Sequence, residues 1–179
     1  MASLIDYFRL IRLPNLFTVP SNILVGISLG SEQTFSIQLV MQIITSILLY
    51  VGGVVLNDYF DFEEDKKHRP NRPVAPGRIP KLNALVLASI AFGISLLIAY
   101  FIGTLSFLIS ILLIVTIIGY DYYLKNSIFG PMVMATARVL NILLGLSTYS
   151  NTVSYNSLTG LVLSDTFLFI FGISLISRS

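Results

Sequence analysis

Hydrophobic residues in this chain occur in long, almost unbroken runs that are separated by short polar segments. A helix that crosses a bilayer needs roughly 20 predominantly apolar residues. Six runs approach that length, and they cover residues 13–30, 37–56, 82–102, 104–123, 129–149 and 160–177. The pattern therefore predicts an all-α, polytopic membrane bundle of about six transmembrane helices.

The N-terminal part departs from this pattern. The first run is polar at its start, and Pro14 and Pro20 are expected to kink it, because proline removes a helical hydrogen bond. Residues 1–12 have the pattern of a short amphipathic helix that lies on the membrane surface. The side chains expected to face lipid there are Leu4, Tyr7, Phe8 and Ile11.

The basic residues predict the orientation of the bundle. Ten of the eleven lysines and arginines lie before the first run or in the segments that follow the second, fourth and sixth runs. The segments near residues 31–36, 103–104 and 150–159 contain none. Cytoplasmic loops carry an excess of lysine and arginine. We therefore expect both termini and the loop at 57–81 to be cytoplasmic, in a multi-pass protein of the plasma membrane.

Composition narrows the possible functions. The chain has 179 residues, of which 55% are hydrophobic and 11% charged, whereas soluble domains carry about 25% charged residues. The spans leave no room for a soluble domain or a nucleic-acid-binding module, so residues 1–179 are interpreted as one transmembrane domain. The chain has no cysteine and a single histidine, His68. These counts exclude disulfides and thiolate sites and disfavour a zinc site.

Charged residues concentrate between the second and third runs, where residues 57–81 contain five acids and six bases. Asn57, Asp61 and Asp65 recur at every fourth position, which places them along one face of a helix. Such oxygen ligands suit Mg²⁺, which takes one or two carboxylates and completes its shell with water and substrate phosphates. A solvated connecting loop is the alternative interpretation.

A basic loop follows these acids directly. Pro70 and Pro73 prevent the helix from continuing, so the chain must turn back as a loop that carries Arg69, Arg72 and Arg78. The arginine side chain matches phosphate geometry with two parallel N–H donors. Acids that hold a metal, followed by arginines on a bent loop, predict a diphosphate site.

A second polar group lies inside the fifth run. Arg138 and Asn141 are three residues apart and share a helix face, and ionisable residues inside a membrane usually mark function. The alternative is a structural ion pair between Arg138 and Asp121. Asp121 belongs to the segment at 120–125, Tyr-Asp-Tyr-Tyr-Leu-Lys, which closes the fourth run.

Glycines indicate where helices approach closely, because small residues permit close backbone contact between membrane helices. Gly26, Gly30 and Gly145 are expected at such packing positions. Gly52 and Gly53 precede the acids by one turn, where either a close helix contact or a bulky substrate fits.

Taken in order, these segments resemble the UbiA superfamily of intramembrane prenyltransferases. Residues 57–65 have that family's N-D-x-x-D-x-x-x-D form, and residues 69–73, Arg-Pro-Asn-Arg-Pro, are similar to the stretch that follows it. Residues 120–125 resemble its tyrosine–lysine element, and residues 138–141 resemble its R-x-x-N span. The link at 124–131 is similar to that of the UbiA-like proteins of bacterial ebo gene clusters.

The resemblance implies a prenyltransferase that moves an isoprenyl group from a polyprenyl diphosphate to a lipophilic aromatic or lipid acceptor, with Mg²⁺ as cofactor. The implied metal ligands are Asn57, Asp61 and Asp65. The residues implied in catalysis are Asp61, Asp65, Lys125 and Arg138. The residues implied in substrate binding are Asn57, Asp58, Arg69, Arg72, Tyr120, Asp121 and Asn141.

The same resemblance implies roles for the aromatic segment. Tyr120, Tyr122 or Tyr123 would present a π face to the allylic cation. Asp121 would either orient a basic residue or take the proton of the acceptor.

The family fold has about nine spans and a second Asp-rich motif after the sixth, which this chain lacks. We therefore interpret the chain as a C-terminally truncated member, either a fragment of a longer gene or a truncated gene product. A half-size member that works with a partner is another explanation. A non-catalytic prenyl-lipid-binding or assembly protein of the same fold is the alternative. A CDP-alcohol phosphatidyltransferase is disfavoured because the chain contains no Asp-Gly pair. A transporter is disfavoured because the spans lack a relay of ionisable residues.

Overall fold

The computed structural model describes residues 3–30, 35–149 and 156–177, and within these ranges every regular element is helical. The elements are α1 (Leu4–Leu10), α2 (Leu13–Leu16), α3 (Val19–Leu29), α4 (Ile37–Phe60), α5 (Phe62–His68), α6 (Lys81–Ile102), α7 (Thr104–Gly119), the π-helix η1 (Tyr120–Leu124), α8 (Gly130–Leu146) and α9 (Ser157–Ile176). The predicted all-α fold is confirmed.

Each predicted apolar run contains at least one helix, and the protein is a multi-pass integral membrane protein. Among the described residues, four helices are long and apolar enough to cross a membrane, and they cover Ile37–Phe60, Lys81–Ile102, Thr104–Leu124 and Ser157–Ile176. A fifth candidate is the pair Leu4–Leu10 and Leu13–Leu29, which is bent by 53°. Helix α8 is apolar but has 17 residues. A count of six spans therefore stays a prediction.

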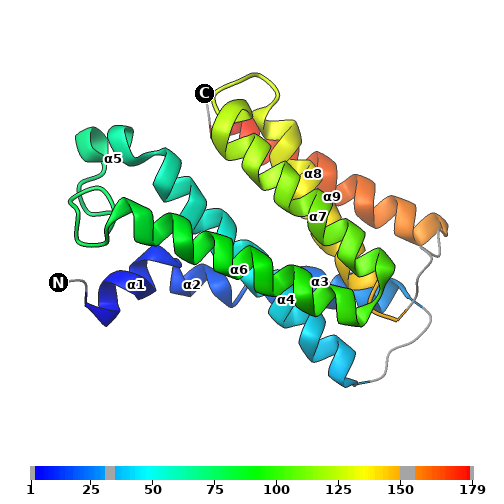
Figure 1. The fold of residues 1–179 in the computed structure, drawn as a ribbon. Helices are drawn as coiled ribbons and strands as arrows, with labels where there is room; N and C mark the ends of the chain where they lie inside the picture. Colours follow the sequence, from blue (N-terminus) through cyan, green and yellow to red (C-terminus); the bar gives the residue numbers. More distant parts are fainter. Residues whose placement is uncertain (1–2, 31–34, 150–155, 178–179) are drawn as a thin grey trace.

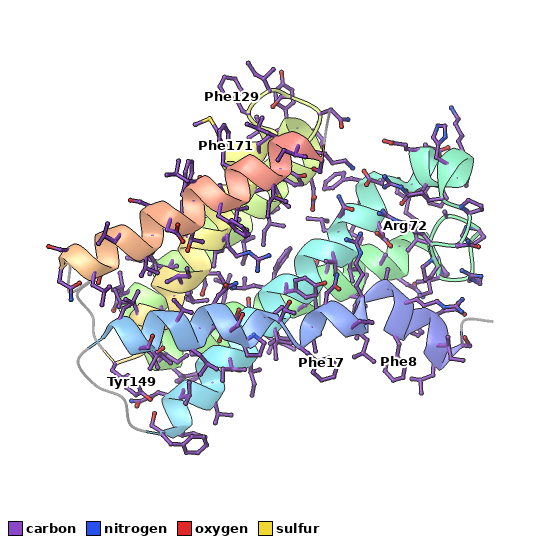
Figure 2. The ribbon with its side chains drawn as sticks, turned by 180° about the vertical axis from the view of Figure 1, so that it is seen from behind. Phe8, Phe17, Arg72, Phe129, Tyr149 and Phe171 are labelled. Atoms are coloured by element: carbon purple, nitrogen blue, oxygen red, sulfur yellow. The ribbon has the colours of Figure 1, made fainter. Side chains whose placement is uncertain are left out.

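The N-terminal region is broken in the way that its prolines predict. Pro14 and Pro20 each occupy the first turn of a new short helix, α2 and α3, where proline is tolerated. Leu4 and Phe8 of α1 are largely exposed, and Figure 2 shows Phe8 on the outside of the molecule. Ile11 instead packs against the buried core, so its predicted lipid-facing position is wrong.

The helices pack around one core, both with neighbours in the sequence and across the chain. Helix α4 packs along α6, and α8 lies between α3 and α9. In Figure 1, α9 runs along the outer side of α8. Gly52 of α4 faces the ring of Phe92 on α6, where a Cβ atom would lie 2.5 Å from the ring. Of the two interpretations of this glycine, the close helix contact is the correct one.

Glycines also make the crossing of α3 and α8 possible. A Cβ atom on Gly26 would lie 2.1 Å from the carbonyl oxygen of Ile142, and one on Gly145 would lie 2.4 Å from the carbonyl oxygen of Ile23. Both approaches are to backbone atoms, which cannot rotate away. Gly26 and Gly145 are therefore packing positions, as predicted. At Gly30 a Cβ atom would meet an atom of the preceding turn, at 3.3 Å, and no second helix among the described residues.

We expect Gly26→Ala to lower the free energy of unfolding by about 1–3 kcal/mol, the usual cost of overpacking a tight contact. Thermal unfolding of the purified chain in detergent measures this loss. Gly93→Ala is the matched control, because no atom lies within 4 Å of its added Cβ and alanine is the better helix former. Equal unfolding temperatures for Gly26→Ala and the unmodified chain would contradict the packing assignment.

Candidate functional site

A cavity of about 380 Å³ opens between α4, α7 and α8, with the α1–α2 junction at one side. Its walls are largely apolar and include Leu49, Val54 and Ile117. Gly53 also lines it, and a Cβ atom there would lie 3.2 Å from the Ile117 side chain of α7. Its polar lining residues are Arg12, Asn15, Ser46, Tyr50, Asn57, Thr116, Tyr120, Asp121, Arg138 and Asn141. An apolar pocket with a few convergent polar groups is the usual form of a small-molecule site.

The predicted acidic ladder follows the end of α4. Asp61 lies between the two helices, as the C-cap of α4 and the N-cap of α5. The ladder therefore crosses a helix junction and is not part of one continuous helix. Helical hydrogen bonding nevertheless continues, because the Asp61 N–H donates to the Asn57 carbonyl at 2.9 Å and the Asp65 N–H donates to the Asp61 carbonyl at 2.8 Å. The spacing of these three residues is therefore maintained as predicted.

Arg72 reaches back from the loop after α5 and joins the aspartates. Its Nη1 lies 3.0 Å from Asp58 Oδ1, 2.7 Å from Asp65 Oδ2 and 3.7 Å from Asp61 Oδ2. Figure 2 labels Arg72 beside this part of the chain. Arg69 lies 3.6 Å from Asp65 and is more exposed. The structure thus brings the predicted acids and these two predicted arginines together.

Lys125 is placed by the π-turn η1. The Lys125 N–H donates to the Tyr120 carbonyl at 2.8 Å, five residues back, and π-turns often occur at functional sites. The Lys125 ammonium donates a hydrogen bond to Asp61 Oδ1. The same turn directs Tyr120 into the cavity wall and leaves Tyr122 and Tyr123 about three-quarters exposed, at 73% and 78%. Of the three tyrosines predicted to present a ring to the allylic cation, Tyr120 is the one that lines the cavity.

Asp121 accepts a hydrogen bond from Asn57 Nδ2 at 3.0 Å. Its other oxygen, Oδ2, is buried and has no hydrogen-bond partner among the described residues. Asn57 and Asp121 both line the cavity, so they connect the acidic ladder to its interior. A buried acceptor without a partner is costly, and a ligand donor in the cavity would satisfy it.

Arg138 and Asn141 lie on the cavity face of α8, as their spacing predicts. Asn141 Oδ1 accepts a hydrogen bond from Ser46 Oγ of α4 at 2.8 Å. Within the described part of the chain, Arg138 forms no ion pair or hydrogen bond. The alternative of a structural Arg138–Asp121 pair is therefore wrong, and a cation faces the cavity uncompensated.

Arg12 was not predicted as a site residue, yet it belongs to the same cluster. Its Nη2 lies 3.3 Å from Asp58 Oδ1 and 3.5 Å from Asn57 Oδ1, and it lines the cavity. Its φ of 50° is the left-handed conformation that non-glycine residues rarely adopt. In the sequence, Arg12 is one of several basic residues beside a span and has only topological meaning.

Arg78 was predicted to share the diphosphate site, and this prediction is wrong. Its Nε lies 3.1 Å from Asp6 Oδ1 of α1, and its Nη2 donates to the Asn71 carbonyl at 2.7 Å. Arg78 therefore fastens the loop after α5 to the N-terminal helix. Gly77 permits this turn with a φ of 77°.

The oxygen donors of Asn57, Asp61 and Asp65 have the chemistry that Mg²⁺ requires. They do not form a preassembled site, because Asn57 Oδ1 accepts from Arg12, Asp61 Oδ1 from Lys125 and Asp65 Oδ2 from Arg72. In the part of the chain that the structure describes, no group of three His, Cys, Asp or Glu side chains is arranged to hold a metal. Asp65 Oδ1 is buried without a hydrogen bond there, and Arg69 Nη1 lies 3.6 Å from it.

Comparison with known proteins identifies the family. The sequence model of the UbiA prenyltransferase family matches residues 19–178. The chain belongs to the UbiA prenyltransferase family. This confirms the resemblance that the ordered motifs predict, whereas the finer similarity to ebo-cluster proteins stays a prediction.

Relatives of this UbiA-family chain include two archaeal digeranylgeranylglyceryl phosphate synthases. The protein from Saccharolobus solfataricus is 31% identical over 150 residues, which cover 80% of this chain and 51% of the relative. The protein from Sulfurisphaera tokodaii is 28% identical over 144 residues, which cover 78% of this chain and 51% of the relative. The chain thus spans about half the length of these curated relatives.

Solved structures share the UbiA-family fold. A structure described as that of digeranylgeranylglyceryl phosphate synthase in membranes has a TM-score of 0.82 at 22% identity and matches 94% of this chain and 60% of its own. A UbiA homolog from Archaeoglobus fulgidus, bound to GPP and Mg²⁺, has a TM-score of 0.79 at 20% identity, with coverages of 93% and 60%. At these identities the likeness concerns the fold.

Proposed function

We propose that residues 1–179 form one transmembrane domain that binds an isoprenyl diphosphate for Mg²⁺-assisted transfer to a lipophilic acceptor. One observation carries the proposal: the buried carboxylates of Asp58, Asp61 and Asp65 and the cations of Arg72 and Lys125 gather beside an apolar cavity. This combination offers both a charged site for the diphosphate and an apolar space for the chain. The names of the relatives agree with it.

The donor headgroup is assigned to the charged cluster. Asn57, Asp61 and Asp65 would hold Mg²⁺, and Arg69 and Arg72 would bind phosphate oxygens from the loop side. Arg12 would do so from the α1–α2 junction. When bound, Mg²⁺ neutralises negative charge that develops on a departing diphosphate. Asp58 holds the two arginines in place, with contacts of 3.3 Å to Arg12 and 3.0 Å to Arg72.

The reaction that this site would promote breaks the allylic C–O bond of the donor. The electron pair of that bond leaves with the diphosphate, and arginines held in position stabilise it without reorganisation at the moment of reaction. Tyr120 on the cavity wall would present its ring to the allylic cation. The apolar walls exclude water, which would otherwise capture the cation and hydrolyse the donor.

The acceptor is assigned to the part of the cavity between α4 and α8. Arg138, Asn141 and Tyr50 line it, and Tyr50 Oη is buried with no hydrogen-bond partner among the described residues. These groups can bind polar atoms of an otherwise lipophilic molecule. Asp121, which is bonded to Asn57, would accept the proton that the acceptor loses.

The orientation proposed for the domain follows its basic residues. Arg12, Arg72 and Lys125 meet in one charged cluster, as the asymmetry of the loops predicts. We assign this cluster to the cytoplasmic side of the plasma membrane, where a soluble diphosphate headgroup can enter. The hydrophobic chain of the donor would then extend between the apolar helices.

Binding of a non-reactive donor, geranylgeranyl thiodiphosphate, to the purified chain in detergent tests the proposal. We expect saturable binding with Mg²⁺ that weakens at least about tenfold with EDTA or in Asp61→Ala, in line with typical effects of lost metal ligation. Glu64→Ala is the matched control, because Glu64 is an exposed acid of the same segment. A folded chain that does not bind the analogue, or binds it equally in all conditions, would contradict the proposal.

The non-catalytic alternative predicts the same binding without turnover. Incubating the chain with radiolabelled geranylgeranyl diphosphate and a membrane lipid extract separates the two. Labelled prenyl product indicates a transferase, and bound but unchanged donor indicates a carrier.

A further inference from the structure

We infer that Lys125 and Arg72 act as internal counter-cations that occupy the metal-binding carboxylates until Mg²⁺ and diphosphate arrive together. In this exchange, the two cations transfer from aspartates to phosphate oxygens as the metal takes their place. The site would then select the metal–diphosphate complex over either free component. The inference rests on the proposed donor site and adds how that site chooses its ligand.

The first observation is the position of Lys125. Its ammonium bonds directly to Asp61 Oδ1, one of the oxygens that a metal would need. Asp61 is 7% exposed, and the Lys125 side chain is 19% exposed, so solvent screens this pair little. A metal that binds Asp61 must therefore displace a partly buried cation, and that cation must find another anion.

The second observation is that Arg72 forms the same kind of contact with the other carboxylates. Its Nη1 bridges Asp58 and Asp65 at 3.0 and 2.7 Å. The Asp65 carboxylate is 1% exposed and cannot turn to water as a substitute partner. Displacing Arg72 without a new anion would leave buried charge unpaired, which is strongly unfavourable.

The third observation is the charge balance of the whole cluster. Its carboxylates are Asp58, Asp61, Asp65 and Asp121, and its cations are Arg12, Arg69, Arg72 and Lys125. The cluster is therefore neutral as it stands. Free Mg²⁺ would make it positive and free diphosphate would make it negative, whereas the complex of the two largely preserves the balance. Each component is thus expected to increase the affinity for the other.

Mn²⁺ binding, followed by the EPR signal of the free ion, tests this exchange with and without geranylgeranyl thiodiphosphate. For the unmodified chain in detergent, we expect weak Mn²⁺ binding that the analogue strengthens by about 5- to 150-fold, the usual range of coupling between sites. In Lys125→Met, Mn²⁺ alone should bind about tenfold more tightly, a typical gain when one competing charge is removed. The factor by which the analogue strengthens Mn²⁺ binding should therefore be smaller in this variant than in the unmodified chain.

Lys66→Met is the matched control, because Lys66 is an exposed lysine that pairs with Glu63 at 3.9 Å, outside this cluster. It should leave Mn²⁺ affinity unchanged. Tighter Mn²⁺ binding in both lysine variants would show that the net charge of the chain alone explains the effect, and this would overturn the inference. So would weaker or unchanged Mn²⁺ binding in Lys125→Met while the analogue still binds, an outcome that leaves the proposed function standing.

The unmodified chain provides a test that does not depend on a folded variant. Equal Mn²⁺ affinity with and without the analogue, when the analogue itself binds, overturns the exchange. An unmodified chain that does not bind the analogue at any Mn²⁺ or Mg²⁺ concentration overturns the proposed function and the exchange with it. Lys125→Arg, which keeps the charge, should retain weak Mn²⁺ binding and strong enhancement.

Discussion

Asp65→Asn and Asp61→Asn are each expected to abolish isoprenyl transfer while the protein still inserts into the membrane. Asparagine keeps the shape of the side chain but loses the negative charge that a hard cation requires. Losing one preorganised electrostatic contact to a transition state commonly costs about 10²–10³-fold in rate, and here the metal and the arginine network are both affected. Asp65 contacts Arg72 at 2.7 Å and is 1% exposed, so water cannot replace the lost charge.

Transfer is measured with radiolabelled geranylgeranyl diphosphate in membrane vesicles that contain the chain, and insertion is measured by extraction of the vesicles at alkaline pH. Glu64→Gln is the control, because it removes one negative charge from the same segment at an exposed position. Its turnover should match that of the unmodified chain. Unchanged turnover in Asp61→Asn or Asp65→Asn would show that these carboxylates do not hold the metal.

Arg72→Gln is expected to destabilise the chain by about 3 kcal/mol. Removing one partner of a buried ion pair typically costs about 3–5 kcal/mol, and the lower value applies because 23% of the Arg72 side chain is exposed. The cost arises from Asp58 and Asp65, which are 3% and 1% exposed and would lose their closest cation. Loss of the loop-to-helix connection would also weaken donor binding.

Unfolding of the purified chain in detergent measures this loss, with Lys67→Gln as the control for an exposed base of the neighbouring helix. Adding Asp58→Asn to Arg72→Gln should restore part of the lost stability, because it removes one of the carboxylates left unpaired. A double variant that is less stable than Arg72→Gln alone would indicate that shape, rather than charge, explains the contribution of Arg72. Stability equal to that of the unmodified chain in Arg72→Gln would contradict the buried network.

The glycines show how far sequence reasoning extends. Gly26 and Gly145 could be predicted as packing positions because small residues in apolar helices have few other uses. Their partners could not be predicted, because the contact joins residues that lie far apart in the chain. Gly52 and Gly53 are neighbours in the sequence with identical local context. One meets Phe92 and the other lines the cavity, and only the position of the surrounding helices distinguishes them.

The sequence alone determined the helices, the ladder of Asn57, Asp61 and Asp65, and the position of Arg138 on the same face as Asn141. These features follow from apolar length and helical periodicity, which depend on residues close together in the chain. Tertiary structure decided which charges meet. It paired Arg78 with Asp6 and brought Arg12 to Asp58. Ion pairs depend on distances between separate elements, and those distances exist only after the helices have packed.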